Sequence, residues 1–565
     1  MKKLLALIPA ALTALLLWSA YAPMNESCAI VFALVPMLVI SRFCTPKRSL
    51  ALWTICGLLF WVATLSWMPA IIKNNGPWPL VILGWFGLGT ACALFFSAFG
   101  WLTARAWQAV RMRGDRAGET LLVLLVVEPF VWAGLEWCRS VVPFGGFAWN
   151  YLGTAVGGIP SFAAPARLGG VYFVSALVVL LNGVFATLAC RLIRQIRREV
   201  EPTFGTPTRT RLVRALETGA PLLLILASFY LAGACAPTGE ARPLKIALVQ
   251  RNAPCIFKPQ VKPVNPYDVF DNMLSTATVA KPDLIVWGES AMAEFRTSLN
   301  QVRAKEVARH YADLTGGAAL LAGGDWWFSV ETPAGEVRRA QNGAALFVVS
   351  PTNVAVQAYG KQHLVPFGEY IPCDKLIPIL QKLSPIGISL WPGEAKTLDL
   401  NGIKLAPLIC FEDTDPTLAR KAARLGAQAI VLITNDSWFS FSHEAEQHAQ
   451  QAVLRAIETG IPVIRVGNSG VTGLISPSGR TRWLEDGEGK LLIDAAGTML
   501  ETVYVPVSPK PTPYTRYGDI PLLVLFSLLF VALCLVPTKP EVKLSERAEK
   551  PQCRVSSPPG LTNLS

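Results

Sequence analysis

Charged residues are scarce in this chain of 565 residues. Lysine, arginine, aspartate and glutamate together supply 16% of it, against roughly 25% in an average soluble protein, while hydrophobic residues supply 52%. So little charge over so great a length excludes a protein that is soluble throughout, and it predicts several domains with part of the chain in lipid. Eight apolar runs approach the roughly 20 residues that cross a bilayer as a helix, and they lie near residues 3–20, 28–42, 50–68, 79–101, 120–138, 168–190, 219–236 and 519–536.

Positive charge is almost absent from every second loop between these runs, such as "YAPMNES" and "IIKNNGPWP", whereas arginine and lysine crowd the other loops. Because positive loops stay in the cytoplasm, we expect the amino terminus inside and the long polar stretch outside. The first run also has the pattern of a signal peptide, but we favour an uncleaved helix. The predicted order is a membrane domain of seven helices (1–236), an exterior domain (237–518), an eighth membrane helix (519–537) and a disordered cytoplasmic tail (538–565).

The net charge of +12 gives no independent sign of nucleic-acid binding, because most of it falls in the predicted cytoplasmic loops. A disulfide framework is also missing. Of the twelve cysteines only Cys255, Cys373 and Cys410 fall in the exterior stretch. An odd number leaves at least one thiol unpaired there, unless it bonds outside the domain.

Histidine is rare as well, with four residues in the chain. His443 and His448 are five residues apart, which is about 140° around a helix, whereas a zinc-binding helix needs a pair at i and i+4. We therefore interpret His448, together with Arg455 and Glu458, as structural polar residues of one helix. No glycine-rich phosphate loop ends in Lys-Ser or Lys-Thr, and we expect no metal and no other cofactor.

Strand-like and helix-like segments alternate between 237 and 518, which predicts a layered α/β domain. Three apolar segments end in an ionisable residue: Glu289 in "IVWGESA", Lys361 in "AYGKQH" and Cys410 in "LICFED". Strand ends converge on one edge of an α/β sheet. There a carboxylate can take a thiol proton, the thiolate can attack a carbonyl, and an ammonium can stabilise the oxyanion. Each residue alone also suits a structural role, as a capping glutamate, a surface lysine or a core cysteine.

Five motifs of the exterior stretch, "IVWGESA", "YGKQHLVPFGEYIP", "LICFEDT", "ITNDSWFS" and "HAQQAVLRAIETGIPVIRVGNSGVTGLISPSG", resemble the nitrilase superfamily. More specifically, they resemble its membrane-embedded apolipoprotein N-acyltransferases, and the resemblance extends to "PFGGFAWNYLG" in the predicted membrane domain. It implies a multi-pass α-helical membrane domain plus an exterior α/β nitrilase-like domain, an αββα sandwich, on the periplasmic side of the bacterial inner membrane. It also implies the last step of lipoprotein maturation: transfer of an acyl chain from a phospholipid, through a cysteine thioester, to the N-terminal α-amine of a diacylglyceryl-cysteine apolipoprotein.

The same resemblance assigns roles to individual residues. Glu289 matches the base, Lys361 the oxyanion partner and Cys410 the nucleophile. Glu369 matches a second carboxylate that orients the site, and Glu412 matches the acidic residue two positions after the cysteine.

Two positions depart from the family pattern. Many members carry tyrosine directly after the cysteine, so Phe411 is expected to act by packing, and Pro259 stands where relatives can carry a lid tryptophan. Apolar loops around Trp391, Trp438 and Phe439 are expected to face lipid and substrate, with burial in the core as the alternative.

Two other functions stay open at this point. One is an amidase or nitrilase tethered to the membrane, which would hydrolyse small soluble amides without its helices. The other is a transporter or receptor whose outer domain binds a ligand without reacting. Intramembrane charges are few, chiefly Glu128 and Glu136, which argues against a transport path.

The predicted topology can be tested with a reporter enzyme that is active only outside the cytoplasm. A fusion after Pro237 should be active, whereas fusions after Arg198 or Lys539 should be inactive. Activity of the fusion after Arg198 would overturn the predicted orientation.

Overall fold

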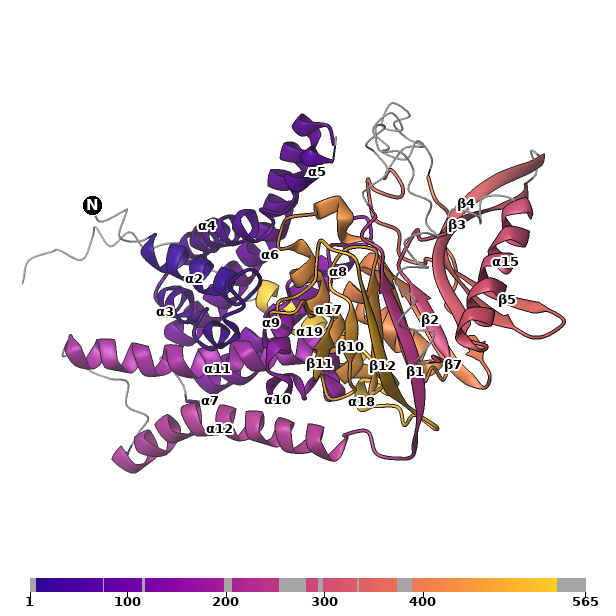
Figure 1. Ribbon diagram of the computed structural model, residues 1–565. Coiled ribbons are helices and arrows are strands. Elements are labelled where there is room, and N and C mark those ends of the chain that lie inside the picture. Colours follow the sequence, from indigo (N-terminus) through magenta and orange to yellow (C-terminus); the bar gives the residue numbers. More distant parts are fainter. Residues whose placement is uncertain are drawn as a thin grey trace, which may run out of the picture.

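The computed structural model of the protein describes residues 7–74, 76–113, 117–197, 206–253, 281–292, 298–332, 335–372 and 389–535, and Figure 1 shows its two parts side by side. Residues up to 234 form a bundle of helices, and residues 241–517 form two β-sheets with their own helices. The last helix, at 520–535, returns to the bundle, where Arg105 donates to the carbonyl of Leu533 at 3.0 Å. The predicted tail at 538–565 lies outside the described residues, as do Cys255, Cys373 and Pro259.

The apolar runs form helices. Those before the sheets are α2 (Ile8–Ser19), η1 (Ser27–Val31), α3 (Val35–Ser41), α4 (Pro46–Thr64), α5 (Ala70–Lys73), α6 (Trp78–Met112), α7 (Ala117–Leu122), η2 (Val123–Val127), α8 (Glu128–Val141), α9 (Leu152–Ala155), η3 (Val156–Gly158), α10 (Pro160–Ala163), α11 (Ala166–Ile196) and α12 (Pro207–Ala234). Among the residues that the structure describes, four spans are long and apolar enough to cross a membrane: α6, Gly118–Val141, α11 and α12. The other four predicted runs coincide with α2, with η1 and α3, with α4 and with α19 (Ile520–Leu535), so eight crossings stay a prediction.

Helix α11 is broken near its start, at Gly169 and Gly170. Gly170 has a φ of 71°, and a Cβ there would lie 2.6 Å from the ring of Tyr514, so the position favours glycine. The break frees the N–H of Val171, which donates to Glu458 Oε1 at 2.7 Å. A side chain from the part that holds the sheets therefore caps a broken helix of the bundle.

The second part contains two sheets of six strands. The first has the order β12-β1-β2-β3-β4-β5 and the second the order β11-β10-β9-β8-β7-β6. The central strands β1, β2 and β3 run parallel, as do β7, β8 and β9. The strands are β1 (Ala241–Gln250), β2 (Leu284–Trp287), β3 (Ala319–Thr332), β4 (Gly335–Val349), β5 (Val354–Gly360), β6 (Leu398–Leu400), β7 (Ile403–Ile409), β8 (Ala429–Thr434), β9 (Val463–Gly467), β10 (Gly473–Ile475), β11 (Thr481–Trp483) and β12 (Gly497–Pro506).

Alternate residues of the central strands face opposite layers, as the period of two in a strand requires. Leu248 of β1 packs with Ile433 of β8 between the sheets, whereas Val249 packs with Tyr311 of α15 (Ser298–Thr315) on the outer face. Helices α16 (Pro416–Arg424) and α17 (Glu444–Thr459) cover the other outer face and share one hydrophobic core with the bundle (Figure 1). The predicted αββα sandwich beside a helical membrane domain is confirmed.

One buried side chain, Gln447 of α17, joins the sandwich to the helical bundle. Its amide nitrogen donates to the carbonyl oxygens of Ala22 and Thr64, at 2.9 and 3.3 Å. Its amide oxygen accepts three hydrogen bonds, from Trp67 Nε1 at 3.3 Å, Trp149 Nε1 at 2.9 Å and Asn150 Nδ2 at 3.2 Å. Because these partners come from separate segments of the bundle, Gln447 fixes α17 against several of them at once.

Replacing Gln447 with alanine should destabilise the protein, because three buried donors would lose their acceptor. We expect a loss of about 2–3 kcal/mol, measured as a lower unfolding temperature in detergent micelles. Gln450→Ala is the control, since Gln450 lies on the same helix but makes an exposed hydrogen bond to Asn25. Equal losses in the two variants would contradict the special role of Gln447.

Candidate active site

Cys410 lies at a sharp corner between β7 and the 3₁₀ turn η6 (Cys410–Thr414). Its φ is 52°, in the left-handed region that residues with a Cβ rarely adopt. The neighbouring strand β8 runs parallel to β7 and pairs Ile433 with Ile409, so its last residue, Thr434, ends beside this corner. The thiol therefore lies at the carboxyl end of the parallel strands of the second sheet, where the sequence predicts it.

Glu412 holds this corner to the end of β5. Its Oε2 accepts hydrogen bonds from the N–H of Ile409 at 2.7 Å and from the hydroxyl of Tyr359 at 2.8 Å. Its Oε1 accepts from the N–H groups of Gln362 and His363, at 2.6 and 3.1 Å. The carboxylate is fully buried, and burial raises its pKa against the effect of these hydrogen bonds. Glu412 is thus a structural brace between two strand ends.

Lys361 follows β5 and is buried between two carboxylates. Its Nζ lies 2.8 Å from Glu369 Oε1 and 4.0 Å from Glu289 Oε1. Burial by itself would lower the pKa of Lys361, but the negative charges of Glu369, the Cys410 thiolate and Glu289 raise it overall. The ammonium therefore keeps its proton throughout the neutral range.

Glu289 follows β2 and completes the group. Burial is the main cause that raises its pKa to about 7, with Lys361 opposing this and Glu369 adding to it. Asn342 Nδ2 donates to both carboxylates, to Glu289 Oε1 at 2.6 Å and to Glu369 Oε1 at 3.0 Å. A carboxyl group with a pKa near neutrality suits a general base.

The charges of Glu289 and Lys361 affect the pKa of the Cys410 thiol. Burial raises its pKa, the charge of Glu289 raises it further, and the charge of Lys361 lowers it. The structure thus brings Glu289, Lys361 and Cys410 together with Glu369, as the sequence predicts. Asn342 was missed, because an asparagine inside a strand carries no local signal of the two carboxylates that it bonds.

A loop of the helical bundle covers this corner. The ring of Phe411 lies parallel to those of Phe147 and Trp149, with centroids 6.1 and 6.2 Å away, and meets His363 edge-on at 5.7 Å. The loop is tied to the Lys361 segment as well, since the hydroxyl of Tyr370 donates to the carbonyl of Phe144 at 3.0 Å. Phe411 therefore packs at the boundary between the two parts of the molecule.

The three aromatic residues expected to face lipid differ in their surroundings. Trp391 is 43% exposed and lies under the guanidinium of Arg339, with 4.9 Å between the charge and the ring centroid. Phe439, in contrast, is partly buried against Trp67 of the bundle, with the ring centroids 4.8 Å apart. Trp438 is also partly buried, and its carbonyl oxygen accepts a hydrogen bond from the Asn74 side chain at 2.7 Å. The lipid-facing interpretation stays a prediction.

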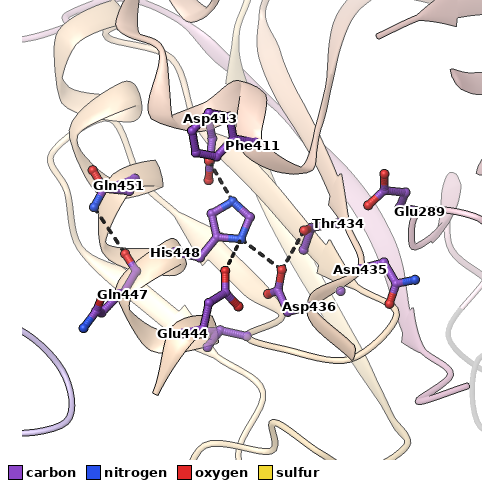
Figure 2. Close-up of polar contacts among 12 residues, drawn as sticks. Glu289, Phe411, Asp413, Thr434, Asn435, Asp436, Glu444, Gln447, His448 and Gln451 are labelled. Carbon is purple, nitrogen blue, oxygen red and sulfur yellow. Dashed lines mark hydrogen bonds and ion pairs between the residues drawn. The ribbon is translucent and has the colours of Figure 1, made fainter. Parts of the chain in front are cut away.

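A second polar cluster surrounds His448, next to the turn η6 that begins with Cys410, and Figure 2 shows this cluster. Within the described ranges, Asp436, Glu444 and His448 are a group whose ligand atoms lie within 4.8 Å of one another, as in a metal site. The donor set does not fit a cation well. Both ring nitrogens of His448 lie 2.9 Å from an aspartate oxygen, and the guanidinium of Arg465 lies 3.2 Å from Asp436. Positive side chains therefore already fill the places around the carboxylates that a metal ion would need.

Comparisons with known proteins find matches to both the helical part and the sheet-containing part of the chain. A family model described as "Apolipoprotein N-acyltransferase N-terminal domain" matches residues 13–184, and one described as "Carbon-nitrogen hydrolase" matches residues 267–511. An apolipoprotein N-acyltransferase of Pseudomonas syringae pv. tomato is 30% identical over 550 residues, covering 93% of this chain and 95% of its own. One from Geobacter metallireducens is 28% identical over 499 residues, covering 86% of this chain and 87% of its own. Among solved structures, an amidase from Nesterenkonia sp. covers 49% of this chain and 94% of its own at 20% identity, with a TM-score of 0.33.

The pKa of Glu289 predicts how the Cys410 thiol responds to pH. Alkylation of Cys410 by iodoacetamide should accelerate as the pH rises through about 7, because Glu289 accepts the thiol proton only when it is ionised. In Glu289→Gln this step should vanish, and alkylation near neutral pH should slow about 100-fold. Peptide mass spectrometry over a pH series measures both rates, with Cys235 as an internal control that should react alike in the two proteins. An unchanged profile in Glu289→Gln would exclude Glu289 as the base.

Proposed function

The chain belongs to the apolipoprotein N-acyltransferase family, and we propose that it makes a thioester on Cys410 from a phospholipid acyl chain and passes that chain to an apolipoprotein. The acceptor is the N-terminal α-amine of a diacylglyceryl-cysteine. The observation that carries the proposal is the position of the thiol, on a strained strand-to-turn corner beside a carboxyl group with a pKa of about 7 and a buried ammonium.

The first half-reaction loads the enzyme. Glu289 takes the proton of the Cys410 thiol, and the thiolate attacks the ester carbonyl of the phospholipid. The carbonyl oxygen becomes an oxyanion that the Lys361 ammonium stabilises, while Glu369 holds that ammonium at 2.8 Å. The tetrahedral intermediate then expels the lysophospholipid oxygen, which takes the proton from Glu289, and the acyl chain stays on sulfur.

The second half-reaction releases the acyl chain. After the lysophospholipid leaves, the acceptor α-amine attacks the thioester carbonyl and gives its proton to Glu289. Lys361 stabilises the second oxyanion in the same place. Collapse of this intermediate breaks the C–S bond, forms the amide, and returns the proton to the sulfur of Cys410. Two substrates that react in turn at one nucleophile give ping-pong kinetics.

Water has to be kept from the thioester between these two steps. The aromatic contact of Phe411 with Phe147 and Trp149 supports such a role for the bundle, since it packs apolar rings against the residue that follows the nucleophile. It also favours transfer over the alternative of a tethered amidase, because a site covered by a membrane-domain loop is not independent of its helices.

The lipid substrates place the reaction at a membrane surface. We infer a multi-pass protein of the bacterial inner membrane, with residues 237–518 on the periplasmic side between the seventh and eighth helices. Trp391 and Phe441, which are 43% and 80% exposed, are the apolar side chains that we propose to contact lipid near the site. Both are far more exposed than Phe439, which packs on Trp67.

Mass spectrometry of the purified protein after incubation with phospholipid tests the covalent step. The peptide that contains Cys410 should gain the mass of one acyl chain, and this mass should disappear when a synthetic diacylglyceryl-cysteine peptide is added. Cys410→Ala should abolish both the acyl-enzyme and the product, because no other group in the site is a comparable nucleophile. Cys255→Ala and Cys373→Ala are the controls and should keep both, and normal product formation by Cys410→Ala would overturn the proposal.

A further inference from the structure

His448 lies at the centre of a buried cluster that the reaction steps above do not use. Its Nε2 lies 2.9 Å from Asp413 Oδ1, in the turn η6 that begins with Cys410. Its Nδ1 lies 2.9 Å from Asp436 Oδ1, in η7 (Asp436–Phe439), and 3.8 Å from Glu444 Oε1 one helical turn earlier (Figure 2). All four side chains are buried, so none of these interactions is shared with solvent.

The two hydrogen bonds fix the protonation state of the ring. An ionised carboxylate can only accept, so both ring nitrogens donate and His448 is an imidazolium. Burial and Arg465 oppose this charge, but the two aspartates raise the pKa of His448 to about 10.

Arg465 completes the balance of charge. Its guanidinium bonds Asp413 Oδ2 at 3.0 Å and Asp436 Oδ2 at 3.2 Å. Two cations thus face two aspartates, while burial and the charge of Asp436 raise the pKa of Glu444 well above its usual range and keep it neutral. The cluster is neutral as a whole only if His448 carries its proton.

The two aspartates belong to the two turns on either side of the nucleophile. Asp413 is three residues after Cys410 in η6. Asp436 Oδ1 also accepts the hydroxyl of Thr434 at 2.8 Å. Burial raises the pKa of the Cys410 thiol, and the Thr434 side chain opposes this. A bridge from Asp413 to Asp436 therefore holds the surroundings of the thiol in two ways: through the turn that Asp413 shares with Cys410, and through Thr434, which is bonded to Asp436.

We propose that His448 is a positioning residue for Cys410, which as an imidazolium ties the turn that carries the nucleophile to the turn that carries Asp436 and Thr434. This inference rests on the proposed role of Cys410 as nucleophile. A residue with a φ of 52° keeps that conformation only when its surroundings hold it, and His448 supplies that hold together with Arg465. The adjacent residue Gln447 is hydrogen-bonded to the helical bundle, so the packing of α17 against the bundle also fixes the position of His448.

His448→Gln tests the bridge with little change in size. The neutral amide can donate to one aspartate, but its oxygen then faces the other, and one buried carboxylate loses its partner. We expect the rate of acyl-enzyme formation on Cys410 from phosphatidylethanolamine in mixed micelles to fall about 100-fold. The rate of Cys410 alkylation by iodoacetamide, which needs no lipid, should fall with it. His443→Gln is the matched control: His443 lies at the start of the same helix, and its ring nitrogen Nε2 lies 3.4 Å from the carbonyl oxygen of Thr64, away from the aspartates.

The double variant His448→Gln/Asp436→Asn separates the bridge from simple packing. It removes one positive and one negative charge, and the new asparagine amide can donate to the glutamine oxygen. If His448 acts as a charged bridge, the double variant should recover about tenfold of the lost rate, the size of an ordinary coupling between contacting residues. If His448 only fills space, a second substitution in the same cluster should slow the enzyme further.

Each outcome decides the inference. Wild-type rates in His448→Gln, or a double variant slower than the single one, would overturn it. If the single variant fails to fold, a double variant that folds and reacts supports the bridge, and a double variant that also fails to fold overturns it. The two proposals remain distinguishable, because loss of alkylation in His448→Gln without any acyl-enzyme in the unaltered protein would refute the proposed function and leave the positioning role intact.

Discussion

Charge buried around the Cys410 corner has to be balanced inside the protein, because burial removes most of the solvation that water gives to an exposed charge. Lys361 lies between Glu369 and Glu289, while His448 and Arg465 lie between Asp413 and Asp436. These two groups flank the same turn. Removing one member would leave a buried charge without its partner, so the geometry of the corner depends on all of them together.

Helix α17 connects this electrostatic arrangement to the membrane part. Gln447 and Glu458 bond the helical bundle, whereas His448 and Arg455 reach the turn after Cys410, with Arg455 Nη1 3.2 Å from the carbonyl of Asp413. In a helix with 3.6 residues per turn these two sets lie on adjoining faces, and Arg455 bonds Glu458 across them at 2.7 Å. The bundle is therefore part of the support of the active site as well as its attachment to lipid.

The proposed thioester intermediate requires such a construction. The reactive acyl group has to survive until the acceptor arrives, so the site has to be dry, and a dry site makes each charge costly. The rings of Phe147 and Trp149 pack on Phe411, the residue after Cys410, and the core between the two sheets packs against Cys410 itself. Burial is also the main cause that raises the pKa of Glu289 to about 7, which suits the role of base that we propose for it.

The sequence by itself determined the apolar runs of the bundle, a layered α/β domain and the three ionisable residues at the strand ends, because apolar periodicity and strand termini are local signals. The αββα arrangement followed from the resemblance to the nitrilase superfamily. Only the tertiary structure decided that Asn342 bonds both carboxylates, that Phe439 packs on Trp67, and that His448 bridges Asp413 to Asp436. Those contacts join segments far apart in the chain. No local pattern encodes them, since they exist only once the two sheets and the bundle have packed and their buried charges have to be paired.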